Sequence, residues 1–365
     1  MIYLDNGATS FHKPPEVQQA VLDAMRRCAN PGRGGYPAAM AATEQVYRCR
    51  EAASDLFGCQ PEQVALTSNC THGLNIAIRT LVKPGDRVVI SGFEHNAVTR
   101  PLHALSAKIT VAGQRLFDWE DTLEEFEKGL RTGPNAAIFT HVSNVFGYIL
   151  PVERMAQLCR QYGVPFIIDA AQSAGAIPVN LKSLGADFIA MPGHKGLLGP
   201  QGTGLLLCSR LPEPLLQGGT GSDSIRQEMP DYLPDRVEAG TVNVPGIAGL
   251  AAGLRHLRRV GVENIGRREQ VQAQKAADGL KRLGVQVFSG PHQGGTVSFL
   301  PSMDCDEFAQ KLAKRGIAVR AGLHCAPLAH KSAGTLETGT VRVSFGHDAS
   351  QRQTQQFLAA MAAHI

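Results

Sequence analysis

The sequence has no strong excess of charge of either sign. Its 365 residues include 36 Lys and Arg against 32 Asp and Glu, a formal net charge of +4. Nucleic-acid and membrane-surface binding need concentrated positive charge. Here the basic residues are scattered apart from short pairs such as Arg258-Arg259. We therefore predict no nucleic-acid partner and no membrane partner.

Long apolar runs and paired metal-binding motifs are also missing. No run approaches the roughly 20 residues that a membrane-spanning helix needs. The first residues, Met1 to Asp5, lack the basic region and long apolar core of a signal peptide. We expect a cytoplasmic protein, in which the eight cysteines are reduced. No CxxC spacing occurs and the Cys and His residues are dispersed, so we expect no metal site.

Short apolar runs alternate with helical patterns over the first two thirds of the chain. The runs cover residues 64–67, 87–90, 136–140, 165–169, 188–191 and 204–207, and helical spacing appears at 15–27, 38–56, 72–82, 97–106 and 152–162. This alternation predicts an α/β fold, with a mainly parallel sheet covered by helices on both faces. Ligands of such sheets bind beyond the carboxyl ends of the strands, so the residues after each run are site candidates.

The last third predicts a smaller α+β unit. Its expected helices cover 247–260, 263–283, 304–315 and a stretch from 351, and its strands cover 296–300, 317–320 and 341–345. A chain of this length can form two domains. We divide it into an N-terminal arm (1–14), a large domain (15–245) and a small domain (246–365) that carries a cysteine loop.

The residues after the first three runs suit ligand binding. Thr67 to His72 are mostly small or hydroxyl residues that open a helix, which suits a phosphate held by backbone N–H groups. The same residues also make a good N-cap. His95 follows the second run, where it can stack on a planar ligand or fill a loop. Asn144 follows the third.

The fourth and fifth runs end in charged residues. Asp169 closes the fourth, and a carboxylate there needs a cationic partner, either a protein side chain or a protonated ring nitrogen. Lys195 follows the fifth, among glycines whose backbone can approach a ligand closely. Alone, Lys195 also fits an ordinary solvated loop lysine. A lysine, an aspartate and a phosphate-type helix start together indicate pyridoxal 5'-phosphate, because the lysine forms a Schiff base and the aspartate keeps the pyridine nitrogen protonated.

Motifs in matching order carry a resemblance over nearly the whole chain, from Tyr3-Leu4-Asp5-Asn6 to Val341-Arg342-Val343-Ser344-Phe345-Gly346. On these residues the sequence resembles the cysteine desulfurases, in the class V aminotransferase branch of fold-type-I pyridoxal phosphate enzymes. The resemblance implies a homodimer that converts L-cysteine to L-alanine.

Residue roles follow from the resemblance. It implies that Lys195 binds the cofactor covalently, that Asp169 pairs with its ring nitrogen and that His95 stacks on the ring. Gln172 and Asn144 are implied neighbours of the ring hydroxyl or the substrate carboxylate. The phosphate positions correspond to Cys70, Thr71 and His194, with Thr220 supplied by the partner subunit. Gly7, Gly193 and Cys70-Thr71-His72 depart from the commoner alanine, serine and Thr-Thr-Glu or Ala-Thr-Glu.

Cys325 is the predicted nucleophile. Most cysteines are small buried hydrophobes, but Cys325 lies in a polar loop after a glycine, beside His324 and near Arg320. Positive neighbours raise the thiolate fraction of a thiol. Arg342 on the following strand can bind a substrate carboxylate with a bidentate fork, or it can be a surface strand arginine. Arg33, in a glycine-rich loop, is a further candidate for an anionic substrate group, although such loops are common.

These assignments predict a reaction and its partners. Lys195 removes the Cα proton of cysteine, and the Cys325 thiolate attacks the substrate sulfur, which leaves alanine and a persulfide on Cys325. The loop between Cys325 and Arg342 is short compared with relatives that carry the cysteine on a long arm. We therefore expect a sulfur-acceptor protein to dock close to Cys325.

Other activities fit parts of the same pattern. A class V aminotransferase, a selenocysteine lyase acting on L-selenocysteine, or another β-eliminating lyase would share the cofactor. A regulatory or scaffold protein could keep the fold, but it would not need Lys195, Asp169, Cys325 and Arg342 together. Residues 199–204 are rich in glycine, yet their spacing fits neither the dinucleotide fingerprint nor the phosphate loop of nucleotide hydrolases.

Overall fold

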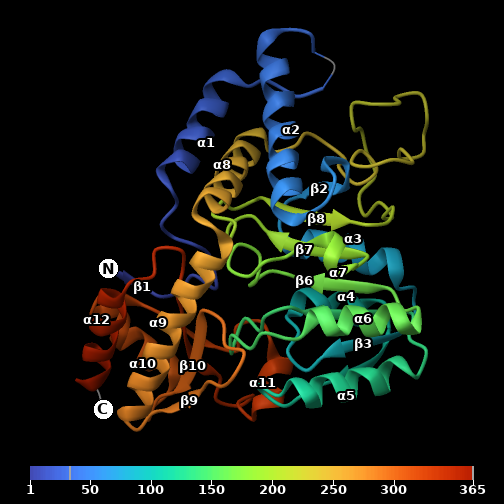
Figure 1. Cartoon of the computed structure of the whole chain (residues 1–365). Coiled ribbons are helices and arrows are strands. Elements are labelled where there is room, and N and C mark those ends of the chain that lie inside the picture. Colours follow the sequence, from blue (N-terminus) through green and yellow to red (C-terminus); the bar gives the residue numbers. More distant parts are fainter. Residues whose placement is uncertain (33, 364–365) are drawn as a thin grey trace.

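The computed structural model describes residues 1–32 and 34–363, and its centre is a seven-stranded sheet (Figure 1). The strand order is β2-β8-β7-β6-β5-β3-β4. The strands are β2 (Val64–Thr67), β3 (Arg87–Ser91), β4 (Lys108–Ala112), β5 (Ala136–Thr140), β6 (Phe166–Asp169), β7 (Phe188–Pro192) and β8 (Gly204–Cys208). β8 alone runs in the direction opposite to the other strands of this sheet. The prediction of a mainly parallel sheet is confirmed.

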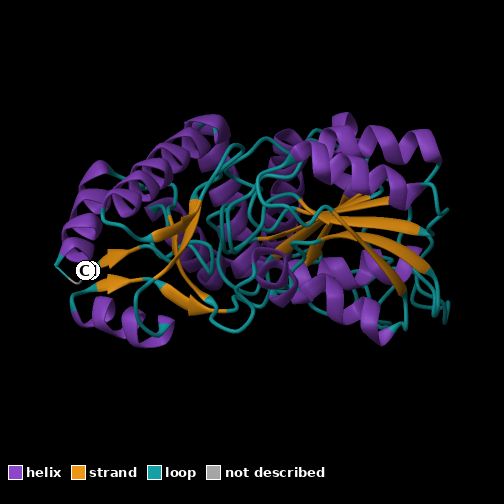
Figure 2. Cartoon of the chain, turned by 90° about the horizontal axis from the view of Figure 1, so that it is seen from below, coloured by secondary structure: helices purple, strands orange, loops and turns teal. Residues whose placement is uncertain are grey.

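Helices cover both faces of this sheet (Figure 2). One face packs on α3 (Cys70–Leu81) and α4 (Asn96–Ala104). The other face packs on α2 (Pro37–Phe57), α5 (Trp119–Leu130), α6 (Val152–Tyr162), α7 (Leu181–Leu184) and α8 (Val244–Val260). Side chains alternate across a sheet, so neighbouring residues of one strand lie in different hydrophobic cores. In β3, Val89 packs in the core with α2 and α5, whereas Val88 and Ile90 pack in the core with α3 and α4. Among the described helices, none combines the length and apolarity needed to cross a bilayer.

A second, antiparallel sheet forms the smaller unit. Its order is β12 (Arg320–Gly322), β13 (Thr340–Ser344), β10 (Thr296–Leu300) and β9 (Gln286–Phe288). The helices α9 (Val262–Arg282), α10 (Cys305–Lys314) and α12 (Gln351–Ala362) contribute to its apolar core. The predicted fold class is thus confirmed. Most of α8 lies after residue 245 but shares the core of the large sheet, so the division at that residue stays a prediction.

The N-terminal arm runs along the smaller unit. Its strand β1 (Ile2–Tyr3) pairs in parallel with β11 (Ile317–Ala318). The predicted single strand at 317–320 is wrong, because the chain leaves one sheet after Ala318 and enters another at Arg320. After the arm, α1 (Pro15–Arg27) packs against α2 and α8, and η1 (Pro61–Gln63) leads into β2.

A loop of the smaller unit docks on the large sheet near residues 146–149. Gly294 N–H donates to the carbonyl of Gly147 at 2.7 Å. Nearby, the imidazole of His292 stacks on the indole of Trp119, with ring centroids 3.5 Å apart and planes inclined by 5°. Trp119 begins α5, so this stack joins a helix of the large sheet to the β9–β10 loop. The two units are therefore in contact away from the candidate site as well as at it.

Candidate active site

A cavity of about 200 Å³ lies beyond the carboxyl ends of β5, β6 and β7, as expected for this topology. Eight predicted site residues line it: Cys70, Thr71, His95, Asn144, Asp169, Gln172, His194 and Lys195. They come from the ends of different strands and from the helices that follow those strands. The parallel sheet is what brings together residues that are up to 125 positions apart in the chain, from 70 to 195.

Asp169 is held at the floor of this cavity. Its Oδ1 accepts a hydrogen bond from the backbone N–H of Ala171 at 2.9 Å and one from the thiol of Cys70 at 3.4 Å. Its Oδ2 accepts no hydrogen bond from the described residues. One carboxylate oxygen is thus fixed and the other can accept a proton donor from a ligand. The side chain of Cys70 faces Asp169, so only its backbone N–H, in the first turn of α3, is placed for a phosphate.

The N-terminus of α3 forms another wall. Asn69 caps the helix, and its side chain accepts the backbone N–H of His72 at 2.9 Å. Thr71 adds a hydroxyl beside the free N–H groups of the first turn. His194 hydrogen-bonds through Nδ1 to the hydroxyl of Thr9 at 3.0 Å. Burial lowers the pKa of His194 to about 4, with the charges of Lys195 and Lys13 acting in the same direction, so its ring is neutral at pH 7.

Gly193 stands where relatives often carry serine, and the packing explains the difference. A Cβ atom at Gly193 would lie within 2.1 Å of the Thr203 hydroxyl oxygen. Thr203 is buried and its hydroxyl donates to the carbonyl of Pro200 at 2.6 Å. A serine at 193 would therefore require Thr203 to move. Gly193 offers no side-chain hydroxyl, so Thr71 and the α3 backbone remain as candidate donors for a phosphate.

Lys195 is fixed by close backbone packing. A Cβ atom on Gly196 would lie 2.3 Å from the carbonyl oxygen of Ala174, and one on Gly175 would lie 2.2 Å from that of Gly196. The loop after β7 therefore approaches the loop after β6 as only glycine allows. Burial lowers the pKa of Lys195, and the charge of Arg342 lowers it further against the opposing effect of Asp169. Lys195 is accordingly not an ordinary solvated loop lysine.

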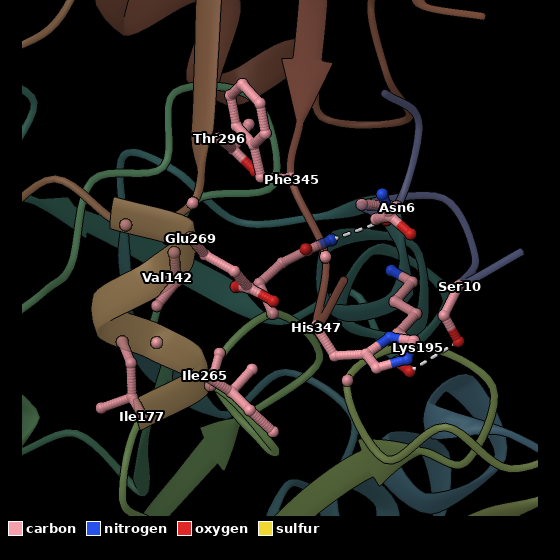
Figure 3. A pocket seen from close by; sticks show the side chains of 18 of the residues that line it. Asn6, Ser10, Val142, Ile177, Lys195, Ile265, Glu269, Thr296, Phe345 and His347 are labelled. Carbon is pink, nitrogen blue, oxygen red and sulfur yellow. Dashed lines mark hydrogen bonds between the residues drawn. The ribbon is translucent and has the colours of Figure 1, made fainter. Parts of the chain in front are cut away.

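The N-terminal arm closes a second pocket next to Lys195 (Figure 3). The hydroxyl of Ser10 donates to the carbonyl of Lys195 at 3.0 Å, and the side-chain amide of Gln172 donates to the carbonyl of Gly7 at 2.9 Å. Lys13 also reaches this region, with Nζ 2.9 Å from the carbonyl of His194. Sequence reasoning missed Ser10 and Lys13, because nothing in the local pattern shows that the arm folds onto a loop more than 180 residues away.

His95 has a defined ring orientation. It caps α4, and its Nδ1 accepts the backbone N–H of Ala97 at 3.0 Å. An accepting Nδ1 leaves the ring proton on Nε2. Burial lowers the pKa of His95, which favours the neutral ring. His95 can therefore exchange a proton at Nε2.

The cysteine loop contacts the cavity through Asn144, although Cys325 itself is not among the lining residues. Cys325 alone is exposed among the eight cysteines. Its carbonyl accepts the backbone N–H of Asn96 at 2.8 Å, and the preceding carbonyl of His324 accepts the side-chain amide of Asn144 at 2.8 Å. His324 and Cys325 both have positive φ, 49° and 56°, which is uncommon outside glycine. The helix α11 (Pro327–Ala333) follows at once.

One premise of the sequence argument for Cys325 is wrong. His324 does not supply positive charge, because burial lowers its pKa to about 2 against the opposing effect of its hydrogen bond to the carbonyl of Thr340. Sequence position could not show that this side chain turns inward while its neighbour turns outward. Arg320 remains a cation on this side of the site, and its hydrogen bonds to Asp5 raise its pKa.

Arg342 is buried, so the alternative of a surface strand arginine is wrong. Its Nη1 donates to the carbonyl of Asn144 at 2.9 Å and its Nη2 to Oδ1 of Asp5 at 2.9 Å. Asn144 thus contacts both Arg342 and the cysteine loop, and its own Oδ1 is buried without a partner in the described chain. These contacts bring Arg342 and Cys325 to the same side of the cavity as Asn144.

The described structure does not bear out two of the predicted site residues, for different reasons. Thr220 does not line the cavity, and its hydroxyl lies 3.0 Å from that of Ser222, in a segment between β8 and α8 without helix or strand. Arg33 lies outside the described residues. Both assignments stay predictions.

The residues present fit pyridoxal phosphate. The site offers a lysine of lowered pKa and an aspartate with one oxygen free. It also has an unpartnered amide oxygen on Asn144 and a helix N-terminus with a threonine. A cofactor with an aldehyde, a protonated ring nitrogen and a phosphate has complementary groups.

Glu94, beneath His95, gives a prediction for stability. It is fully buried, its Oε1 accepts the backbone N–H of Thr140 at 2.8 Å, and its Oε2 has no partner in the described chain. Burial raises the pKa of Glu94 from 4.5 to about 8. Between these values the folded chain holds a proton that the unfolded chain releases, so the free energy of unfolding falls as pH rises.

We expect Glu94→Gln to remove this dependence. Because the neutral amide never ionises, the variant should gain up to roughly 5 kcal/mol relative to the parent between pH 4.5 and pH 8. Denaturant unfolding across that range measures the difference. Glu62→Gln, at an exposed position, should keep the parent profile. Parallel profiles for Glu94→Gln and the parent would contradict the assignment.

Sequence comparison shows relatives over the full length. The family described as "Aminotransferase class-V" matches residues 2–357. A protein of Pyrococcus abyssi named "Probable cysteine desulfurase" is 32% identical, with 99% of this chain and 93% of that protein covered.

Structural comparison gives the same result. The apo structure of a cysteine desulfurase from Thermococcus onnurineus NA1 has a TM-score of 0.92 and 33% identity, and covers 100% of this chain and 94% of that one. The cysteine desulfurase CsdA of Escherichia coli, solved in an S-sulfonic acid form, has a TM-score of 0.85 and 25% identity, with 100% and 94% covered.

Proposed function

Because this chain belongs to the class-V aminotransferase family, and within it to the cysteine desulfurases, we propose that it converts L-cysteine to L-alanine and receives the sulfur on Cys325 as a persulfide. The observation that carries the proposal is the position of Cys325. It is the one exposed cysteine, and its loop is hydrogen-bonded to Asn96 and to Asn144, which lines the cavity together with Lys195.

Both families are generally dependent on pyridoxal 5'-phosphate, and the site residues fit it. Lys195 would hold it covalently, Asp169 would bind the ring nitrogen, and Thr71 with the first turn of α3 would bind the phosphate. When bound, the cofactor supplies an electron sink that stabilises negative charge at the substrate Cα. Cys70 supports Asp169 through its thiol.

Lys195 and Arg342 prepare the substrate. The guanidinium of Arg342 binds the substrate carboxylate through N–H groups that its protein partners leave free. The lowered pKa of Lys195 keeps more of its amine neutral, which lets Nζ accept the Cα proton. His95 can hold or release a proton at Nε2, as its ring orientation allows.

Cys325 then takes the sulfur. Its thiolate forms a bond to the substrate sulfur as the bond between that sulfur and the substrate Cβ breaks. The carbon fragment takes up a proton and leaves as alanine. The net change is L-cysteine plus one Cys325 thiol to L-alanine plus one Cys325 persulfide, so no external oxidant or reductant is needed.

A homodimer belongs to the same proposal. The segment between β8 and α8 contains Thr220 and exposes apolar side chains such as Leu216 and Ile225. Exposed apolar side chains on a segment without helix or strand favour a covering partner. A second copy would cover them and would place its Thr220 at the phosphate, as the family resemblance implies.

Product analysis tests the proposed function. The purified protein, loaded with pyridoxal phosphate, is incubated with L-cysteine or with L-selenocysteine, and alanine is measured. We expect alanine from cysteine and a persulfide on Cys325 by mass spectrometry. Alanine only from selenocysteine would favour the selenocysteine lyase, and pyruvate without alanine would favour a β-eliminating lyase.

Persulfide discharge tests the need for a close acceptor. Cys325 lies on a turn fixed by two interunit hydrogen bonds and followed directly by α11, so the sulfur cannot travel far. We expect a protein acceptor that docks at this loop to remove it at least about tenfold faster than glutathione, since docking raises the effective concentration of the acceptor thiol. Equal rates for glutathione and protein acceptors would contradict this prediction.

A further inference from the structure

The N-terminal arm connects the two sides of the active site. On one side, the hydroxyl of Ser10 donates to the carbonyls of His194 and Lys195, each at 3.0 Å. On the other, the backbone N–H of Gly7 donates to the hydroxyl of Ser344 in β13 at 2.7 Å. Asn6 and Ser10 flank Lys195 in Figure 3. The arm is thus part of the site wall.

Asp5, at the base of this arm, binds two arginines of the smaller unit. Arg320 donates through Nε to both carboxylate oxygens at 3.1 Å and through Nη2 to Oδ2 at 2.8 Å. Arg342 donates through Nη2 to Oδ1 at 2.9 Å. The Asp5 side chain is largely buried, and so is that of Arg342. One carboxylate therefore neutralises only one of two guanidiniums, and the group carries a net charge of +1.

Arg342 keeps unused donors at this position. A guanidinium has five N–H groups, and one is bound by Asn144 and one by Asp5. The Nε–H is buried and has no partner in the described chain. An unpaired buried donor is costly. The described residues therefore leave part of the guanidinium of Arg342 unsatisfied, as expected of a group that binds an anionic ligand.

We propose that Asp5 is a positioning residue for the substrate carboxylate. Asp5 holds Arg342 by one terminal nitrogen, so that its remaining N–H groups stay available to the substrate. Asp5 also reduces the net charge of the Asp5, Arg320 and Arg342 cluster to +1, which the single carboxylate of an amino acid can neutralise. This inference rests on the proposed function, because it takes the carboxylate of an amino acid as the ligand of Arg342.

Loss of the Asp5 charge has a specific consequence. In Asp5→Asn the two arginines carry a charge of +2, which one substrate carboxylate cannot neutralise. A small inorganic anion is then expected to bind the two guanidiniums and to compete with the substrate carboxylate. A residue that only stabilised the fold would not create a new anion site.

The test compares Asp5→Asn with Asp348→Asn. Asp348 also joins the arm to the smaller unit, through His12 at 2.7 Å, but it contacts neither arginine. We expect Asp5→Asn to raise KM for L-cysteine roughly 10- to 100-fold with kcat changed less than about threefold, since one charge-assisted hydrogen bond orients the fork. The KM of this variant should also rise with chloride. Asp348→Asn and the parent should show no such chloride dependence.

A second readout needs no turnover. We expect sulfate to raise the thermal unfolding temperature of Asp5→Asn more than that of the parent. The reason is that sulfate binds the two guanidiniums that the lost carboxylate no longer neutralises. Asp5→Glu, which retains the charge, should respond to sulfate as the parent does even if its KM changes. Equal sulfate responses of all variants would overturn the inference, as would a loss confined to kcat. Absence of alanine formation by the parent would instead refute the proposed function, and the sulfate result would still decide the role of Asp5 in anion exclusion.

Discussion

Cys325→Ala is expected to lose persulfide formation completely and alanine formation from L-cysteine by at least about 100-fold, the scale for loss of a nucleophile. Cys325 is the one exposed cysteine. The other thiol at the cavity, that of Cys70, is buried and donates to Asp169, and burial raises its pKa, so it is a poor nucleophile. Removing the Cys325 thiol leaves the Arg342 and Lys195 contacts unchanged. Alanine release and the mass of the cysteine loop peptide measure the two effects.

Cys28→Ala is the matched control for this experiment. Cys28 is partly buried after α1 and does not line the cavity, so the variant should keep parental rates. Cofactor content should be the same in both variants. Undiminished alanine formation by Cys325→Ala would contradict the assignment of Cys325 as the sulfur acceptor. Formation of a keto acid in place of alanine would instead favour an aminotransferase or a β-eliminating lyase. Retained activity with selenocysteine alone would identify selenium chemistry, because selenide is a better leaving group.

Lys195→Ala is expected to lower kcat for cysteine by about 10³-fold or more, since a positioned proton acceptor alone contributes 10²- to 10⁴-fold. The variant also loses the one amine that lines the cavity beside Asp169. Borohydride treatment followed by peptide mapping should fix the cofactor to residue 195 of the parent and nowhere on the variant.

Lys182→Ala serves as the control for Lys195→Ala. Lys182 is an exposed lysine in the short helix α7, and its removal should alter neither kcat nor the labelled peptide. A labelled peptide that contained Lys13 in place of Lys195 would show that the arm lysine is the attachment point. Added primary amines should restore part of the activity of Lys195→Ala if the missing function is proton transfer.

The central strands could be predicted from sequence because they are continuous apolar runs buried on both faces. The prediction failed where burial is partial. Strand β4 was missed because its first three residues are exposed at the sheet edge, and the three-residue β9 has no buried residue. The strand at 317–320 was divided because β11 pairs with the arm, a contact that spans the whole chain.

The cavity residues could also be predicted, since each follows a strand that the apolar pattern indicates. The ion pairs of the site and the orientations of its side chains could not be predicted. Asp5 meets Arg342 across 337 positions, and no local pattern encodes that pairing. The inward turn of His324 depends on a positive φ and on Thr340 opposite it. Thr203 excludes a side chain at Gly193 only because β7 and β8 are adjacent.

The stack of Trp119 on His292 has a practical consequence, because the chain contains a single tryptophan. All indole fluorescence therefore originates at the junction between α5 and the β9–β10 loop. An imidazole in van der Waals contact quenches indole emission, so the fluorescence intensity of Trp119 reports whether the β9–β10 loop of the small unit remains in contact with α5 of the large one. The protein thus carries an intrinsic optical probe of the contact between its two units, and any separation of the two rings can be followed without a label.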